Sequence, residues 1–398
     1  MPSPLTVHGY KADFIHSKIS LLIHNLISIT DTTGEFLQHL PDGRTIDTKG
    51  WHDWEWTHGI GLYGLYQYSL LLPSMLPQPA PDPSKLPLPL PYLDPATIIK
   101  AWFTEQLPRS TTKNINTMSV FLTLAYLYSA SPTSNHTYRP WLESWASWAM
   151  HSLPRTVYGG FQHTTYSSFN ANELWDDTLM MTVLPLAAIG KVLNRTEYVE
   201  EAKRQTLLHV QYLLDVRTGL WFHGWKFDDA ADGGVGHHFA RARWARGNAW
   251  VTMFVPDFLE LLDLPAGDAL HVHLVGVLQA QCKALKRLQA DDGMWRTLLD
   301  VAASEGSYPE ASATAGIAYG MLKGVRKRYL GEEYEEVAWK AVRAVIGNVS
   351  EEGELLNVSF GTAMGENLQH YKDIPLTSMP YGQAMAMMML GECLRAFI

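Results

Sequence analysis

Hydrophobic and polar positions alternate along the chain in blocks that predict two kinds of helix. Six segments rich in small and apolar residues each follow a Gly-rich or polar loop, and they begin near residues 58, 116, 177, 247, 312 and 381. These segments are apolar nearly all round, which indicates helices that are buried on every side. Six amphipathic segments, which predict half-buried helices, lie between them at 14–29, 95–107, 139–152, 196–214, 266–290 and 332–347.

The spacing of the buried segments indicates an internal repeat, since their starts are 58, 61, 70, 65 and 69 residues apart. Twelve helices that alternate between buried and half-buried would form an inner ring wrapped by an outer ring. The expected fold is therefore all-α, an (α/α)6 barrel that spans residues 1–398 as a single domain. We expect Asn194 to cap the fourth outer helix at its N-terminus, and β-structure to be limited to short hairpins in the loops.

Two segments depart from the repeat. Residues 73–95 contain nine prolines, which cannot form a helix and predict an extended surface insertion. Residues 215–246 form a long loop rich in Trp, His, Gly and Arg. Long loops inside a compact domain are usually functional, so this loop is expected to contribute to the site.

Composition and charge exclude several classes of function. The chain has 31 Lys and Arg against 40 Asp and Glu, a formal charge of −9, which argues against nucleic-acid and anionic-membrane partners. Cys282 and Cys393 are its two cysteines, too few for a disulfide framework or a thiolate zinc site. Neither a membrane span nor a secretory signal is visible. We therefore expect a cytoplasmic protein without metal or cofactor, either a monomer or a homodimer.

Candidate chemistry is concentrated in the loops that precede the inner helices, because these loops converge at one mouth of such a barrel. Positive helix ends meet there and favour an anionic ligand. Aromatic side chains stack on sugar rings, and polar groups beside them read sugar hydroxyls. A saccharide site is predicted from Trp54, Glu55, Asn114, Asn116, His163, Trp175, Asp176, Asp177, His223, Trp225, Trp244 and Arg246.

The adjacent pair Asp176-Asp177 follows Trp175 at the start of the third inner segment. One of the two carboxylates can cap the helix, while the other points into the cleft as a general acid/base. Arg241, Arg243 and Arg246 cluster in an otherwise acidic chain, and a guanidinium group at the mouth suits a substrate carboxylate.

Four motifs occur in an order typical of one enzyme family: Glu173-Leu-Trp-Asp-Asp-Thr-Leu-Met-Met, Gly219-Leu-Trp-Phe-His-Gly-Trp, Trp244-Ala-Arg-Gly-Asn-Ala-Trp and Asp292-Gly-Met-Trp. Over roughly residues 50–390 the chain resembles the unsaturated glucuronyl and rhamnogalacturonyl hydrolases of glycoside hydrolase family 105, and more distantly those of family 88. The resemblance implies the same (α/α)6 barrel. It also implies a substrate that carries a Δ4,5-unsaturated uronic acid, left at a non-reducing end by a polysaccharide lyase.

The resemblance implies a mechanism and roles for several residues. The C4=C5 double bond is hydrated, with one Asp donating a proton to C4 and activating the water that adds at C5. That Asp falls on Asp177. His223 corresponds to a sugar-binding histidine, Arg246 with Trp244 to carboxylate-binding and stacking residues, and His163 to a further pocket histidine. Many relatives carry a second Asp where this chain has Asn116, with Asn114 just before it, so an amide replaces a carboxylate.

Two alternatives remain open on sequence grounds. The first is an inverting glycosidase on the same barrel, in which Glu55 or Glu310 would assist Asp177. Such an enzyme needs two carboxyl groups about 6.5–9.5 Å apart across the sugar. The second is a sugar-binding protein that leaves its ligand intact.

Overall fold

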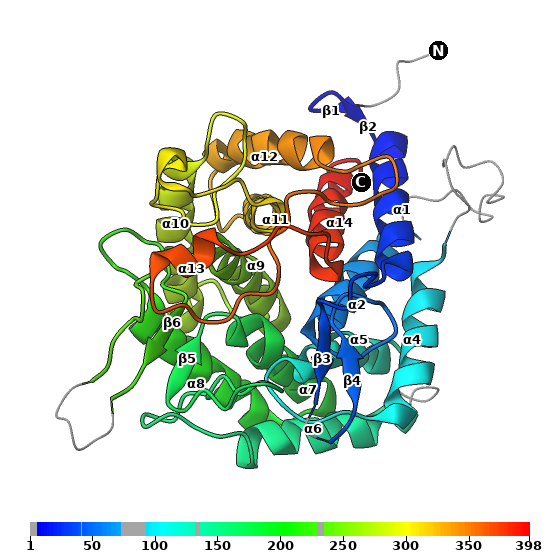
Figure 1. Cartoon of the computed structure of the whole chain (residues 1–398), viewed down its shortest axis with the longest axis vertical. Coiled ribbons are helices and arrows are strands. Elements are labelled where there is room, and N and C mark those ends of the chain that lie inside the picture. The colour runs from blue at the N-terminus through cyan, green and yellow to red at the C-terminus, as the bar shows by residue number, and fades with distance from the viewer. Residues whose placement is uncertain (1–5, 41, 73–92, 132–135, 229–234) are drawn as a thin grey trace.

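The inner helices form a closed ring (Figure 1). The computed structural model describes residues 6–40, 42–72, 93–131, 136–228 and 235–398. Along the chain each inner helix packs against the next, and the last packs against the first. The inner helices are α2 (Trp56–Ser69), α5 (Val120–Ala130), α7 (Leu184–Leu193), α9 (Ala245–Leu262), α11 (Ala311–Arg326) and α14 (Pro380–Arg395).

Each outer helix packs against an inner one: α1 against α14, α4 against α2, α6 against α5 and α7, α8 against α7, α10 against α9, and α12 against α11. The described part of the chain therefore confirms the expected (α/α)6 barrel, with most helix ends within three residues of the predicted ones. The outer helices are α1 (Ala12–Ser28), α4 (Pro95–Arg109), α6 (Arg139–His151), α8 (Thr196–Leu213), α10 (Ala269–Leu288) and α12 (Glu335–Gly347).

Glycines bring the inner helices into backbone contact. A Cβ atom at Gly320 would lie 2.1 Å from the carbonyl oxygen of Thr252 on α9, and one at Gly64 would lie 3.1 Å from the carbonyl oxygen of Ala384 on α14. A larger residue at Gly320 would force α11 and α9 apart. Side chains from both rings form one continuous hydrophobic core.

Short strands and single helical turns fill the connections. The strands form three antiparallel pairs: β1 (Thr6–Val7) with β2 (Tyr10–Lys11), β3 (Leu37–His39) with β4 (Thr45–Asp47), and β5 (Glu173–Trp175) with β6 (Gly224–Lys226). Within the described residues, β1–β2 and β3–β4 are short hairpins as expected, whereas β5 and β6 pair from two separate loops. The short helices are η2 (Thr117–Ser119), η3 (His136–Tyr138), η4 (Leu179–Val183), η5 (Ala303–Glu305), η6 (Glu332–Tyr334) and α13 (Leu368–Lys372).

One capping prediction was wrong. Asn194 ends α7 with a left-handed φ of 53°, and Arg195 precedes α8 without a side-chain cap. Asn tolerates the left-handed conformation that ends many helices. Asn194 therefore caps the C-terminus of α7 instead of the N-terminus of α8. Of the Pro-rich segment, residues 73–92 lie outside the described residues. In the described part of the chain, no helix is long and apolar enough to cross a membrane.

Candidate active site

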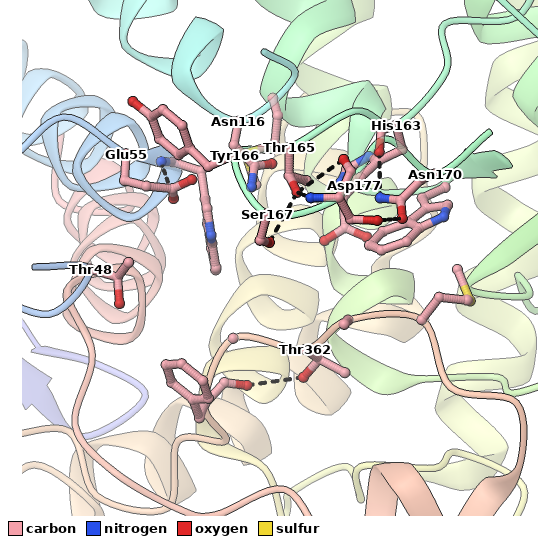
Figure 2. A pocket seen from close by; sticks show the side chains of 18 of the residues that line it. Thr48, Glu55, Asn116, His163, Thr165, Tyr166, Ser167, Asn170, Asp177 and Thr362 are labelled. Carbon is pink, nitrogen blue, oxygen red and sulfur yellow. Dashed lines mark hydrogen bonds between the residues drawn. The ribbon is translucent and has the colours of Figure 1, made fainter. Parts of the chain in front are cut away.

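A pocket of about 400 Å³ opens where the loops that precede the inner helices converge (Figure 2). Its walls come from the segments before α2, α5, η4, α9 and α14, as the barrel geometry predicts. Seven of the residues proposed from the sequence line it: Glu55, Asn116, His163, Trp175, Asp177, Trp244 and Arg246.

The pairing of β5 with β6 brings the two central motifs together. Trp175 pairs with Gly224, and the Asp176 amide N–H donates to the carbonyl of His223 at 3.0 Å. Directly after Asp177 the chain forms η4, a single π-helical turn. Such turns are rare and frequently occur at functional sites. The strand pair and the π turn together aim Asp177 at the pocket.

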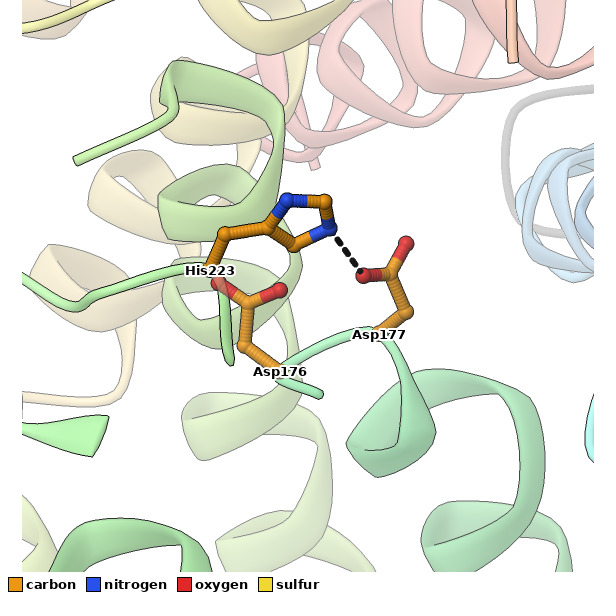
Figure 3. A group of neighbouring side chains, drawn as sticks. All are labelled: Asp176, Asp177 and His223. Carbon is orange, nitrogen blue, oxygen red and sulfur yellow. Dashed lines mark ion pairs between the residues drawn. The ribbon is translucent and has the colours of Figure 1, made fainter. Parts of the chain in front are cut away.

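Asp177 is held by His223, and His223 by Tyr371. The Nε2 atom of His223 lies 3.3 Å from Oδ2 of Asp177 (Figure 3). Its Nδ1 atom lies 2.7 Å from the Tyr371 hydroxyl. The Asp177 side chain remains 15% exposed, whereas His223 is 1% exposed. Of these three linked side chains, Asp177 is therefore the one that can touch a ligand.

Asp176 is fully buried beside Asp177 and does not line the pocket. Within the described residues neither of its oxygens has a hydrogen-bond partner. No side chain caps the start of η4. The expectation that one of the pair caps the helix is therefore wrong. Substrate binding by Asp176 stays a prediction, and its burial outside the pocket lining does not support it. Burial, together with the charge of Asp177, raises the pKa of Asp176 well above its usual range.

The pKa of Asp177 shifts the other way. Burial raises it, but the hydrogen bond and charge of His223, and the nearby His163, outweigh burial and lower the pKa to about 2. One oxygen of each carboxyl group lies within 4.8 Å of the other. The raised pKa of Asp176 and the lowered pKa of Asp177 favour a protonated Asp176 beside an ionised Asp177.

His163 is a neutral neighbour of this pair. Its ring stacks on Trp175 at 4.1 Å between centroids, and Nδ1 lies 2.9 Å from the Thr178 hydroxyl. Burial lowers its pKa to about 3 despite the charge of Asp177. His163 can therefore form hydrogen bonds in the pocket without adding a charge.

Asp176, Asp177 and His223 are also ligand types suited to a divalent cation, with one donor atom from each lying within 4.8 Å of the others (Figure 3). A proton on Asp176, whose pKa is raised, would also allow the two carboxyl groups to lie side by side. The absence of a metal stays a prediction.

Glu55 and Asn116 form another side of the pocket. Glu55 caps the N-terminus of α2, where its carboxylate accepts the N–H of Trp56 at 2.5 Å and completes a capping box with His58. Asn116 lines the same pocket and lowers the pKa of this carboxyl group. Trp56 lines the pocket next to it.

Arg246 lies under a wall of the pocket. Its guanidinium donates to the Ser359 carbonyl and hydroxyl, the Phe360 carbonyl and the Thr362 hydroxyl, at 2.5–2.9 Å. Glu310 lies 3.5 Å from it, fully buried, and accepts the Ser359 amide N–H at 2.8 Å. Arg246 and Glu310 together hold the wall loop, defined as residues 359–364. Glu310 is therefore not placed to assist Asp177 across a sugar.

Arg246 was proposed to bind the substrate carboxylate, and this role stays a prediction. The donors on both terminal nitrogens are directed to the wall loop, so the structure adds a positioning role. Arg243 pairs with Asp215 and Asp300, and Arg241 is exposed and does not line the pocket. The three arginines therefore do not converge on one ligand.

Three other proposed residues do not reach the pocket. Trp54 is buried among Trp102, Phe121 and Trp145, and Asn114 accepts the amide N–H of Thr117. Trp225 packs against Tyr212 and Phe227. On β5, Glu173 and Trp175 face the pocket while Leu174, which pairs with Trp225, faces away. The alternation of side chains along a strand explains why Trp225 faces away as well.

Several lining residues were absent from the proposed site. The loop at 165–170 contributes hydroxyl and amide groups, and the wall loop contributes Phe360 and Thr362. Neither loop has a recognisable motif, although the many hydroxyl and amide residues between Thr164 and Asn172 could have indicated a sugar-binding loop. Tyr371, behind His223, carries no signal in the sequence.

Comparison with known proteins gives a consistent result. Residues 28–397 match the model of glycosyl hydrolase family 88. An unsaturated rhamnogalacturonyl hydrolase of Bacillus subtilis (strain 168), YesR, is 29% identical over 346 residues, which cover 86% of this chain and 90% of that protein.

Solved structures agree with this match. A possible member of glycoside hydrolase family 105 from Salmonella enterica serovar Paratyphi A is 53% identical, with a TM-score of 0.90 over 99% of this chain and 97% of that one. The unsaturated glucuronyl hydrolase of Bacillus sp. GL1 is 18% identical, with a TM-score of 0.64 over 94% of each chain, and shares the fold.

Proposed function

The chain belongs to the glycoside hydrolases of families 88 and 105, and we propose that it releases the Δ4,5-unsaturated uronic acid from the non-reducing end of lyase-generated oligosaccharides. The observation that carries this proposal is Asp177, a carboxylate exposed to a pocket of sugar size and lying beside a buried carboxyl group, Asp176, whose pKa is raised. Trp56 and Trp175 supply flat faces beside it, and Asn116 and Thr362 supply polar groups.

Hydration of the C4=C5 bond begins at Asp177. A proton moves from Asp176 to the neighbouring Asp177, and Asp177 transfers it to C4. The resulting carboxylate accepts a proton from the water whose oxygen bonds to C5. His223 fixes the orientation of Asp177 throughout.

The remaining steps follow from the hydrated sugar. The hydroxyl group at C5 makes a hemiketal with the ring oxygen, and its opening leaves a ketone at C5 and a hemiacetal at C1. The hemiacetal then releases the attached sugar as an alcohol and leaves an aldehyde. One water is consumed for each bond cleaved.

The likeness to YesR supports an unsaturated galacturonyl-rhamnose disaccharide as the first substrate to test. The conjugated double bond absorbs in the ultraviolet, so hydration removes the absorbance. We expect the absorbance to fall as the free neighbouring sugar accumulates in equal amount. Cleavage without loss of absorbance would favour the inverting glycosidase, and an intact disaccharide would favour a binding protein.

A further inference from the structure

Glu55 is a buried carboxyl group of the pocket that has no cation beside it. Its side chain is 2% exposed, and it makes no ion pair with any residue that the structure describes. The buried acids Glu310 and Asp257, by contrast, pair with Arg246 and Lys323. An unpaired buried carboxylate is costly, so an acid in this position favours its neutral form.

The orientation of Glu55 is fixed by the start of α2 and by Asn116. The Trp56 amide N–H donates to Oε2 at 2.5 Å, and the capping box with His58 holds the backbone. The Asn116 amide lines the same pocket (Figure 2), and it lowers the pKa of the carboxyl group. The acid and the amide thus form one rigid polar surface.

Protonation of this surface changes within an accessible pH range. Burial raises the pKa of Glu55 to about 8, although the hydrogen bonds from Trp56, Asn116 and Thr57 lower it. The titratable groups that face Glu55 are His58 on α2 and Tyr166, which reaches across from the 165–170 loop. Below about pH 8 the carboxyl group is neutral and has an O–H to donate.

We propose that Glu55 and Asn116 together bind an oxygen of the unsaturated sugar, with the Glu55 carboxyl group donating the hydrogen bond, which makes Glu55 a specificity-determining residue. This inference rests on the proposed function. A uronate is an anion, and the pocket already contains the carboxylate of Asp177. The O–H of a neutral Glu55 can donate a hydrogen bond to a uronate oxygen. An ionised Glu55 has no proton to donate and repels the anion.

The test measures KM and kcat against pH for the wild type and for Glu55→Gln, with the unsaturated disaccharide as substrate. The amide of Gln is isosteric with the neutral acid and stays uncharged. For the wild type we expect KM to rise about tenfold one pH unit above the pKa of Glu55. For Glu55→Gln we expect KM to stay flat over the same pH range.

Glu332→Gln, in exposed η6, makes the same substitution far from the pocket and should follow the wild-type profile. Asn116→Ala provides a second variant if Glu55→Gln does not fold. Loss of the Asn116 hydrogen bond raises the pKa of Glu55 further, so the rise in KM should shift to higher pH.

Parallel KM profiles for the wild type and Glu55→Gln, or an unshifted profile for Asn116→Ala, would overturn the inference while leaving the hydrolase activity intact. A wild type that is inactive on every lyase product would instead overturn the proposed function and this inference with it.

Discussion

His223 connects Asp177 to Tyr371. Its Nε2 atom lies 3.3 Å from Asp177 Oδ2, and its Nδ1 atom lies 2.7 Å from the Tyr371 hydroxyl. That hydroxyl also accepts the amide N–H of Gly365 at 3.3 Å and donates to Sδ of Met364 at 3.6 Å. Tyr371 therefore fixes the orientation of the His223 ring that faces Asp177.

Tyr371→Phe removes the hydroxyl group that contacts His223 Nδ1, while leaving the pocket lining intact. We expect kcat to fall about tenfold, which corresponds to loss of one hydrogen bond of about 1.4 kcal/mol, with KM little changed. Steady-state kinetics with Tyr212→Phe, on an outer helix, as control would measure this. An unchanged kcat would show that His223 orients Asp177 without Tyr371.

Asp176→Asn should separate stability from activity. The raised pKa of Asp176 means that the folded protein holds a proton which the unfolded chain releases above about pH 4. Because the folded protein binds more protons than the unfolded chain above about pH 4, the free energy of unfolding of the wild type falls as the pH rises above that value. We expect the variant to have the higher melting temperature at pH 7.5, with the difference vanishing near pH 4.

The same variant cannot supply a proton to Asp177, so kcat should fall about 10²-fold or more. Melting temperatures and initial rates at several pH values would test both parts. A kcat equal to that of the wild type, or a melting temperature below that of the wild type at pH 7.5, would contradict the interpretation that Asp176 is protonated and supplies its proton to Asp177.

Chelation tests the other interpretation of Asp176, Asp177 and His223. If Asp176 is protonated and no cation lies between the two carboxyl groups, dialysis against EDTA should leave kcat and KM unchanged within experimental error. Loss of activity that Mn²⁺ or Zn²⁺ restores would show instead that the three residues hold a catalytic metal.

The Arg246–Glu310 pair should stabilise the barrel as well as the wall loop. Arg246→Met leaves Glu310 as a buried charge without its partner, which typically costs about 3–5 kcal/mol. The double variant with Glu310→Gln should be more stable than Arg246→Met alone, because it removes the unpaired charge. Urea unfolding of the four proteins would measure this coupling, and strictly additive effects would exclude it.

Much of the fold could be predicted because each inner helix carries its own signal. An apolar segment that follows a Gly-rich or polar loop recurs six times, and the positions of Asp177, Asn116 and Glu55 at loop ends placed them at one mouth. Which of two neighbouring tryptophans reaches the pocket could not be predicted. Glu55 begins α2, so the chain turns there and buries Trp54 while presenting Trp56.

Tertiary pairing decided the rest of the site. Trp225 belongs to the motif that supplies His223, but strand alternation across β5 and β6 turns it away from Asp177. The wall loop is joined to Arg246 by hydrogen bonds across more than 110 residues, a separation that no local pattern encodes. Long-range contacts of this kind become visible only once the barrel closes.

The central claim is that Asp177 hydrates the C4=C5 double bond. The most direct measurement follows the ultraviolet absorbance of an unsaturated galacturonyl-rhamnose disaccharide with the wild type and with Asp177→Asn. We predict that the wild type removes the absorbance as rhamnose is released, and that Asp177→Asn is slower by about 10³-fold or more while still binding the disaccharide. Release of rhamnose with the absorbance retained, or wild-type rates for Asp177→Asn, would contradict the account.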